Sequence, residues 1–152
     1  VVRATESTLN STRYQSLKAS HALQGEVIER SCHHWVVALE QGKLVPRQRA
    51  SLVADELLDI QRSESVTYIL ACTHFPFLRD EIARCLQRGE RIIDPAPAVI
   101  EQLARRLDLP MPLRVPRGQP RLSVFSSGST AHTQERIREL LGWELAVASL
   151  QF

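Results

Sequence analysis

A short and almost continuously apolar run, Val66-Thr67-Tyr68-Ile69-Leu70-Ala71, constrains the fold of this chain more than any other feature. Its β-branched and aromatic residues favour a strand, and the lack of alternation with polar residues indicates that both faces of the strand are buried. Strands of this kind occur in parallel sheets, because the crossover connections place helices on the two faces. The run therefore predicts an α/β fold built on a parallel sheet.

Helical spacing on both sides of this run supports that prediction. Upstream, Val53, Leu57 and Ile60 recur at i, i+4 and i+7, which is one face of an amphipathic helix within residues 49–62. Downstream, a second helix can begin at Pro76, because the missing N–H of proline costs nothing in the first turn. Similar patterns predict strands at 1–4, 26–29, 92–93 and 122–125, and helices after Ser11, at 36–41, at 98–107 and before Gly142. Alternating strands and helices predict a parallel sheet flanked by helices.

The composition describes a globular domain and excludes several classes of protein. A chain of 152 residues with 43% apolar residues can bury a core and is too apolar for global disorder. Its net charge of +2 gives no basic field for nucleic acid, and no apolar stretch reaches the roughly 20 residues that span a membrane. Three cysteines, an odd number, fit a reducing compartment, so we expect a cytoplasmic protein. Val1 in place of an initiator Met, with no targeting layout after it, suggests a fragment.

The sharpest candidate for chemistry is the segment Ala71-Cys72-Thr73-His74-Phe75-Pro76. It places a thiol, a hydroxyl and an imidazole at the carboxyl end of a predicted parallel strand, where open α/β sheets bind their ligands. A thiol just before a helix experiences the positive end of the helix dipole, which favours the thiolate. The alternative from the residues alone is that Cys72 packs in the core and His74 caps the helix, because cysteine is among the most buried residue types.

Three other kinds of site stay open from the residues alone. A cysteine hydrolase would pair Cys72 with a distant imidazole, either His21 or His132. The segment from Ser126 to Thr130 can either bind an anion or simply begin a helix. Zinc is disfavoured because paired spacings such as C-x-x-C are absent, although suitable ligand types are present in Cys32, His33, His34, Cys72 and His74.

Four segments resemble glutamate racemases, and they follow one another in the order of that family. Cys72-Thr73-His74-Phe75-Pro76-Phe77-Leu78 resembles the motif of the second catalytic cysteine. Ala4-Thr5-Glu6-Ser7-Thr8-Leu9-Asn10-Ser11 with Tyr14 resembles the A-T-x-G-T-x-x-S...Y segment, with Ser7 in place of Gly. The segment from Ser31-Cys32 to Gly42 resembles one that ends in a Glu near the site, and Ile93-Asp94 with Ala96 and Ala98 resembles the D-S-G-x-A stretch. The matches span residues 1 to about 107, and 125–142 resemble the closing segment more weakly.

The resemblance implies a pair of flavodoxin-like α/β halves that face each other across a cleft, each with one cysteine. The C-N-T segment of the first cysteine and the amino-terminal D-S-G-x-G-G segment have no counterpart here, so we expect the carboxyl-terminal portion of a racemase. Residues 1–94 would form the second, central domain. Residues 95–152 would return to the first domain, with a Pro-rich connection near 108–121.

The resemblance also implies interconversion of L-glutamate and D-glutamate by two cysteine bases, without a cofactor or a metal, to supply D-glutamate for peptidoglycan and cell-wall biogenesis. Carried over residue by residue, Cys72 is the acid/base for one enantiomer and His74 assists its proton balance. Glu40 matches a Glu that lies near the His, where a carboxylate fixes the imidazole tautomer. Substrate binding would fall to Thr73, Thr5 and Thr8.

With one of the two cysteines, this chain alone is expected to be inactive. A homodimer is a further expectation, because a missing half would expose apolar surface and sheet edges. Two competing interpretations remain: a non-catalytic binding or regulatory module of the same fold, and a related aspartate racemase. The sequence does not give the pocket volume that would distinguish glutamate from aspartate.

Overall fold

The computed structural model describes residues 1–21, 25–42, 44–57, 66–111 and 122–150. The chain divides into two compact units, Val1–Gln102 and Leu103–Phe152. The helices and strands, in chain order, are β1 Val2–Ala4, α1 Glu6–Leu9, α2 Thr12–Ser20, β2 Glu29–Ser31, α3 His33–Gln41, α4 Pro46–Leu57, β3 Thr67–Leu70, the 3₁₀ turn η1 Phe75–Leu78, α5 Arg79–Cys85, β4 Arg91–Ile93, α6 Ala96–Arg106, β5 Val124–Ser126, α7 Thr130–Leu141 and β6 Val147–Ser149.

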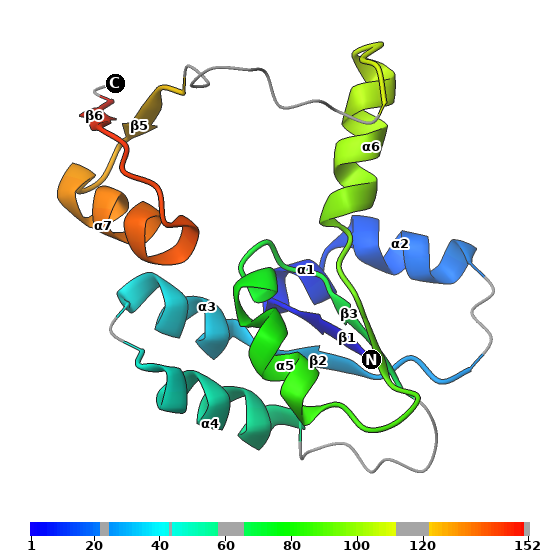
Figure 1. Cartoon of the computed structure of the whole chain (residues 1–152). Coiled ribbons are helices and arrows are strands. Elements are labelled where there is room, and N and C mark those ends of the chain that lie inside the picture. The colour runs from blue at the N-terminus through cyan, green and yellow to red at the C-terminus, as the bar shows by residue number, and fades with distance from the viewer. Residues whose placement is uncertain (22–24, 43, 58–65, 112–121, 151–152) are drawn as a thin grey trace. The chain divides into compact units, whose positions relative to one another are not determined.

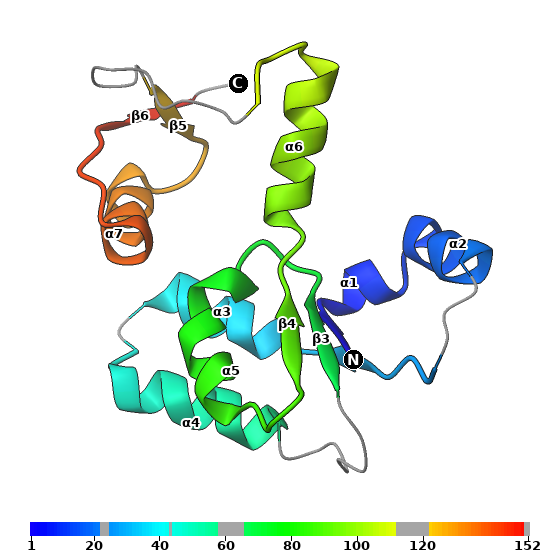
Figure 2. The same ribbon diagram turned by 45° about the vertical axis from the view of Figure 1, so that its right-hand side comes forward.

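The first unit is built on a parallel sheet of four strands in the order β2-β1-β3-β4. β1 is an inner strand, with Val2 opposite Glu29 of β2 on one side and opposite Ile69 of β3 on the other. Figures 1 and 2 show α3, α4 and α5 grouped on one side of this sheet. The predicted parallel sheet flanked by helices is confirmed.

The core of the first unit lies between the sheet and those three helices. Trp35 of α3 is fully buried, and its ring meets that of Phe75 edge-on, with 5.1 Å between the ring centroids. Tyr68 and Leu70 of β3 are buried as well, and so is Leu57 at the end of α4. This packing joins the helices to the strand that leads to Cys72.

Several boundaries differ from the sequence expectations for local reasons. The helix expected at Pro76 starts as a 3₁₀ turn, and the α-helix begins only at Arg79. Between the strand predicted at 1–4 and the helix predicted after Ser11, Thr5 caps the short helix α1 with its side chain, an element that the sequence patterns did not predict. The helix expected over 49–62 is observed as α4, and its predicted end lies outside the described residues.

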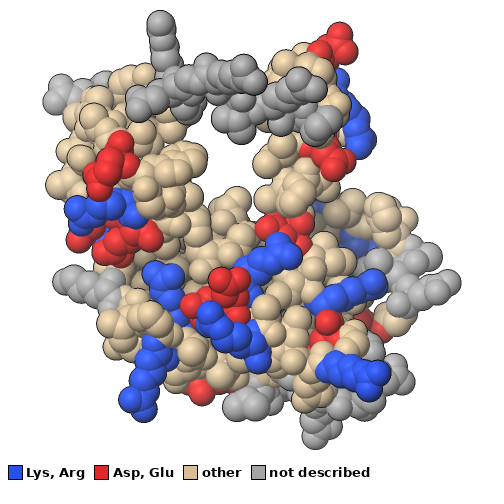
Figure 3. All heavy atoms as spheres, in the orientation of Figure 1, with Lys and Arg blue, Asp and Glu red and all other residues tan. Residues whose placement is uncertain are grey.

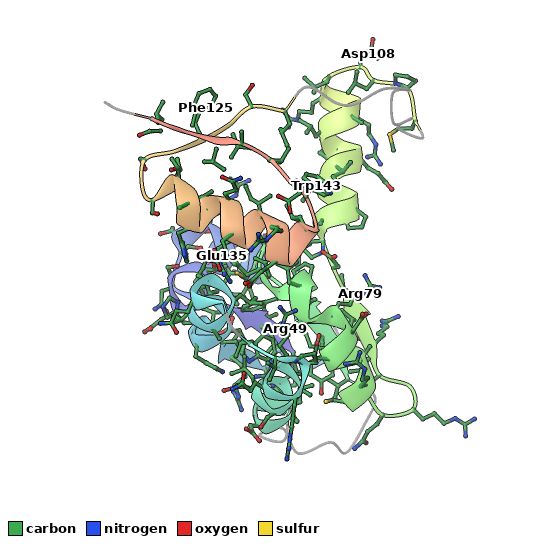
Figure 4. All side chains as sticks on the ribbon, turned by 60° about the vertical axis from the view of Figure 1, so that its left-hand side comes forward. Arg49, Arg79, Asp108, Phe125, Glu135 and Trp143 are labelled. Atoms are coloured by element: carbon green, nitrogen blue, oxygen red, sulfur yellow. The ribbon has the colours of Figure 1, made fainter. Side chains whose placement is uncertain are left out.

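The second unit has a smaller framework of two parallel strands, β5 and β6, and the helix α7. Ser129 caps α7 with its side chain, and Gly142 ends it in the left-handed conformation, as the sequence predicted. The pairing of β5 with β6 was not predicted. Phe125 and Trp143, labelled in Figure 4, are 58% and 53% exposed.

The boundary between the two compact units falls between Gln102 and Leu103. The proposed racemase domains, 1–94 and 95–152, remain a prediction, and most of the Pro-rich connection lies outside the described residues. Figure 3 shows acidic and basic side chains interspersed over the face in view. Within the described part of the chain, no helix is both long and apolar enough to cross a membrane.

Candidate active site

The candidate site lies at one edge of the sheet, where β1 and β3 end. The two strands are parallel, and the backbone N–H of Ala71 donates to the carbonyl of Arg3 at 2.8 Å. Thr5 therefore follows β1, and Cys72 follows β3, at the same edge of the sheet. Ligands of open α/β sheets bind at this edge, because the loops after the strands diverge there.

Cys72, His74 and Glu40 form a continuous line of contacts. The Sγ of Cys72 lies 3.9 Å from Nδ1 of His74, and Nε2 of the same imidazole lies 2.5 Å from Oε1 of Glu40. Cys72 and His74 come from the turn after β3, whereas Glu40 comes from α3, 34 residues earlier than His74 in the chain. The three residues expected to share the site are thus brought together.

The local backbone explains how two residues so close in sequence meet. The N–H of Phe75 donates to the carbonyl of Cys72 at 3.2 Å, and that of Phe77 donates to the carbonyl of His74 at 3.1 Å. These tight turns fold the chain back on itself directly after β3. Phe75 is buried against Trp35 of α3, which holds the turn against the helix that carries Glu40.

The protonation pattern follows from the chemistry of the three groups. An ionised carboxylate only accepts hydrogen bonds, so Nε2 of His74 donates to Glu40. Nδ1 then faces the sulfur of Cys72, where it accepts from the thiol or, when the imidazole is charged, donates to the thiolate. The side chain of Glu40 is 50% exposed and that of His74 27% exposed, so solvent screens their attraction. The hydrogen bond, rather than the attraction of the charges, is therefore the stronger part of the contact between Glu40 and His74.

The expected substrate-binding threonines fall into two groups. Thr73 is exposed and follows Cys72 directly. The hydroxyls of Thr5 and Thr8 lie 3.0 Å apart, because Thr5 caps α1 and Thr8 lies in its first turn. All three residues lie at the edge of the sheet where β1 and β3 end, and their binding role remains a prediction.

A pocket of about 380 Å³ opens beside Cys72. Cys72 and Thr73 lie on one side, after β3. The other side is formed by the end of β4 and the start of α6, where Asp94 accepts a hydrogen bond from the N–H of Ala96 at 2.9 Å. The lining residues are Leu70, Ala71, Cys72, Thr73, Pro76, Asp94, Pro95, Ala96, Val99 and Ile100. The pocket is large enough for an amino acid.

The sequence expectations did not include the second wall of this pocket. The sequence places Asp94 only in a family-like stretch, and Val99 only within the helix predicted at 98–107. A usable signal was present, because Asp94 directly follows the predicted strand at 92–93 and so had to lie at the same edge as Cys72.

The alternative sites find different support. Among the described residues, no group of three or more His, Cys, Asp or Glu side chains is placed to hold a metal ion. His21 contacts the carbonyl of Leu17 at the end of its own helix. The segment from Ser126 to Thr130 begins α7, with the N–H of Gly128 donating to Ser126 and that of His132 donating to Ser129. His74, rather than a distant histidine, is the imidazole that contacts Cys72.

The chain is similar to glutamate racemases in sequence, although no protein-family model matches it. It is 31% identical to the glutamate racemase of Herpetosiphon aurantiacus over 140 residues, which cover 92% of this chain and 55% of that protein. It is 32% identical to the glutamate racemase of Methylococcus capsulatus over 135 residues, which cover 89% of this chain and 49% of that protein. The chain therefore spans about half the length of these relatives.

Solved structures agree in fold. A glutamate racemase isoform from Bacillus anthracis matches 99% of this chain with a TM-score of 0.77 and 21% identity, over 56% of its own length. A glutamate racemase from Francisella tularensis, solved in complex with D-glutamate, matches 99% of this chain with a TM-score of 0.71 and 21% identity, over 56% of its own length. These structures share the fold of the chain, and by its sequence the chain belongs to the glutamate racemase family.

Proposed function

We propose that this chain supplies one of the two acid/base groups that interconvert L-glutamate and D-glutamate. The observation that carries the proposal is the line of contacts from Cys72 through His74 to Glu40, beside a pocket that Cys72 lines. A thiol paired with an oriented imidazole is a group that can exchange a proton near neutral pH. Membership of the glutamate racemase family selects racemisation among the reactions that such a pair can perform.

Proton transfer at Cys72 defines one half of the reaction. The thiolate removes the α-proton of one enantiomer, so the Cα–H bond breaks, an S–H bond forms, and the electron pair stays on the substrate as a planar, carbanion-like state. A second acid then donates a proton to the opposite face of that state. In the reverse direction the thiol of Cys72 donates its proton, and His74 balances the charge that remains on the sulfur.

The charges of the substrate must be met by oriented donors. In this proposal, Thr73, Thr5 and Thr8 bind the substrate, with hydroxyl and backbone donors directed at its carboxylate. Glu40 keeps the imidazole in one orientation, so that Nδ1 always faces the sulfur. No step in this scheme uses a cofactor or a metal.

The second base lies outside the residues that we assign here. One cysteine cannot act on both faces of Cα, so this chain alone is proposed to be inactive or nearly so. The test is to incubate the 152-residue chain with L-glutamate and follow optical rotation. Robust conversion to D-glutamate would show that a second copy or another side chain supplies the missing base.

The role of Cys72 is tested in a complete racemase that contains this segment. Cys72→Ser should lower racemisation by at least about a thousandfold, because a serine hydroxyl does not form an anion near neutral pH and general acid/base catalysis contributes factors of this size. Cys85→Ser is the matched control, since Cys85 lies in α5 and does not line the pocket. Undiminished turnover of the Cys72 variant would remove this thiol from the mechanism.

The biological role and the rivals follow from the same proposal. D-glutamate produced in the cytoplasm would serve peptidoglycan synthesis, and we propose this role for the complete protein.

Competition between L-glutamate and L-aspartate distinguishes a glutamate racemase from an aspartate racemase, with glutamate expected to compete better. A C-N-T segment encoded upstream of Val1 would favour the racemase, and its absence would favour a non-catalytic module of the same fold.

A further inference from the structure

A buried cation lies beneath the candidate site, on the strand that leads to it. Arg3 belongs to the inner strand β1, and its side chain is only 1% exposed. A buried charge requires partners, because its loss of hydration costs several kcal/mol unless hydrogen bonds and an opposite charge replace the water. The partners of Arg3 therefore determine what the residue does.

Among the described residues, the guanidinium of Arg3 contacts the helices α3 and α4. Its Nη1 donates to Oε2 of Glu56 at 3.1 Å, and its Nη2 donates to the backbone carbonyl of Glu56 at 2.9 Å, so Arg3 binds both the side chain and the backbone of one α4 residue. Nη1 also lies 3.5 Å from Sγ of Cys32, the residue at the start of α3. Arg3 thus ties β1 to the last turn of α4 and to the beginning of α3.

The start of α3 is held from a second side. Nε2 of His34 lies 3.3 Å from Oε1 of Glu56, so the two oxygens of this carboxylate connect Arg3 with the first turn of α3. The indole N–H of Trp35 donates to the carbonyl of Leu52 in α4 at 3.3 Å. These contacts fix the beginning of α3 relative to α4.

The other end of the same helix carries Glu40. A helix is stiff over nine residues, so the position of its first turn determines where a side chain in its last turn lies. Glu40 reaches Nε2 of His74 at 2.5 Å, and a small displacement of α3 is enough to break such a contact. The anchor at Arg3 and the contact at His74 are the two ends of one rigid element.

We propose that Arg3 is a positioning residue, which acts through Glu56 and α3 to keep Glu40 hydrogen-bonded to His74. An apolar pair of similar size would fill the same space and is often as stable as a buried ion pair. Such a pair would lack the hydrogen bonds that one guanidinium directs at Glu56 and Cys32. The position of α3 relative to α4 would then no longer be fixed. The importance of this positioning for catalysis rests on the proposed function. The hydrogen bond between Glu40 and His74 can itself be measured without substrate.

The experiment replaces Arg3 and Glu56 together, so that neither member of this ion pair stays without the other. Arg3→Met combined with Glu56→Met is made in the 152-residue chain, and the exchange of the His74 Nε2 proton with water is followed by proton–nitrogen NMR. Glu40→Ala gives the exchange rate of this proton when its hydrogen bond to Glu40 is absent. Lys18→Met combined with Glu29→Met is the matched control, because this 2.8 Å ion pair connects α2 to β2 and does not touch α3.

The expected result is an exchange rate at least about tenfold above that of the parent in the Arg3/Glu56 double variant, the factor that a hydrogen bond to a charged group contributes. The control pair should leave the rate unchanged. Arg3→Lys, which keeps the charge but not the fork of donors, should give an intermediate rate. This single variant also decides the matter if the double variant does not fold.

Parent-like exchange in the folded double variant, or in Arg3→Lys where the double variant does not fold, would overturn the proposal, provided that Glu40→Ala raises the rate. A rise of the same size in the Lys18/Glu29 control variant would also count against a specific role for Arg3. Because the readout uses no racemisation, failure of this inference is distinguishable from failure of the function proposed for Cys72.

Discussion

The two units of this chain are stabilised in different ways. In the first unit, four parallel strands and three helices enclose fully buried side chains such as Trp35 and Tyr68. In the second unit, two strands and one helix leave Phe125 and Trp143 more than half exposed, and Ala104 and Arg136 are the buried residues among those described. Apolar burial dominates the first unit, whereas helix caps and ion pairs within α7 dominate the second.

The difference indicates which unit can hold a preorganised site. Two paired strands are marginally stable alone, and they need a further layer or more strands to bury an apolar face. The Cys72, His74 and Glu40 contacts lie entirely in the first unit, where the core fixes the elements that carry them.

The two tryptophans of the chain give the strongest test of this comparison. Trp35→Ala should lower the free energy of unfolding by about 3–5 kcal/mol, because it leaves a cavity against Phe75. Trp143→Ala should change it by about 0.5 kcal/mol or less, as expected for an exposed residue. Denaturant unfolding followed by far-UV circular dichroism measures both values. Equal losses in the two variants would contradict the view that only the first unit has a packed core.

The buried arginines of the two units give a second, smaller contrast. Glu56→Met removes the carboxylate that lies 3.1 Å from the buried guanidinium of Arg3, which should cost about 3 kcal/mol, the low end of the usual range because Glu56 is 28% exposed. Glu139→Gln removes the 2.6 Å partner of Arg136 within one helix and should cost about 0.5 kcal/mol. Denaturant unfolding measures the stability lost in Glu56→Met. Hydrogen exchange of the Gly142 amide, which donates to the carbonyl of Arg138 at the end of α7, measures the stability lost in Glu139→Gln. A larger effect in α7 would reverse the comparison.

Much of the fold could be predicted because its signals are local. The apolar run 66–71 predicts β3, the spacing of Val53 and Leu57 predicts α4, and Gly142 marks the end of α7. The pairing of β5 with β6 could not be predicted, since 147–149 lack a run of β-branched residues and the partner strand lies 23 positions earlier.

The candidate site shows the same division between local and distant contacts. Cys72 and His74 stand two positions apart, so their proximity could be expected from the sequence. Glu40 was connected with them only by resemblance, because a contact over 34 positions leaves no local signal. Arg3 was read simply as part of a strand, since a charged residue is rarely buried and its partner Glu56 lies 53 positions away.

The smallest expected effect is a pH dependence of the surface contact between α2 and β2. The hydrogen bond from Lys18, at 2.8 Å, and then the neighbouring Tyr14 lower the pKa of Glu29 below its ordinary value of 4.5. A lowered carboxyl pKa gives stability that is present above pH 4.5 and is lost as the pH falls through the folded-state pKa.

The stability difference between the parent and Glu29→Gln should therefore be largest near neutral pH and should vanish in acid. Solvent screens this partly exposed pair, so the difference at neutral pH should stay below about 1 kcal/mol. Denaturant midpoints of both proteins across the acid range measure it, and Glu26→Gln is the control because Glu26 is an exposed residue ahead of the same strand. A stability difference that grew as the pH fell would mean that the fold stabilises the protonated form of Glu29. The contact with Lys18 instead stabilises the ionised form, so that result would contradict the prediction.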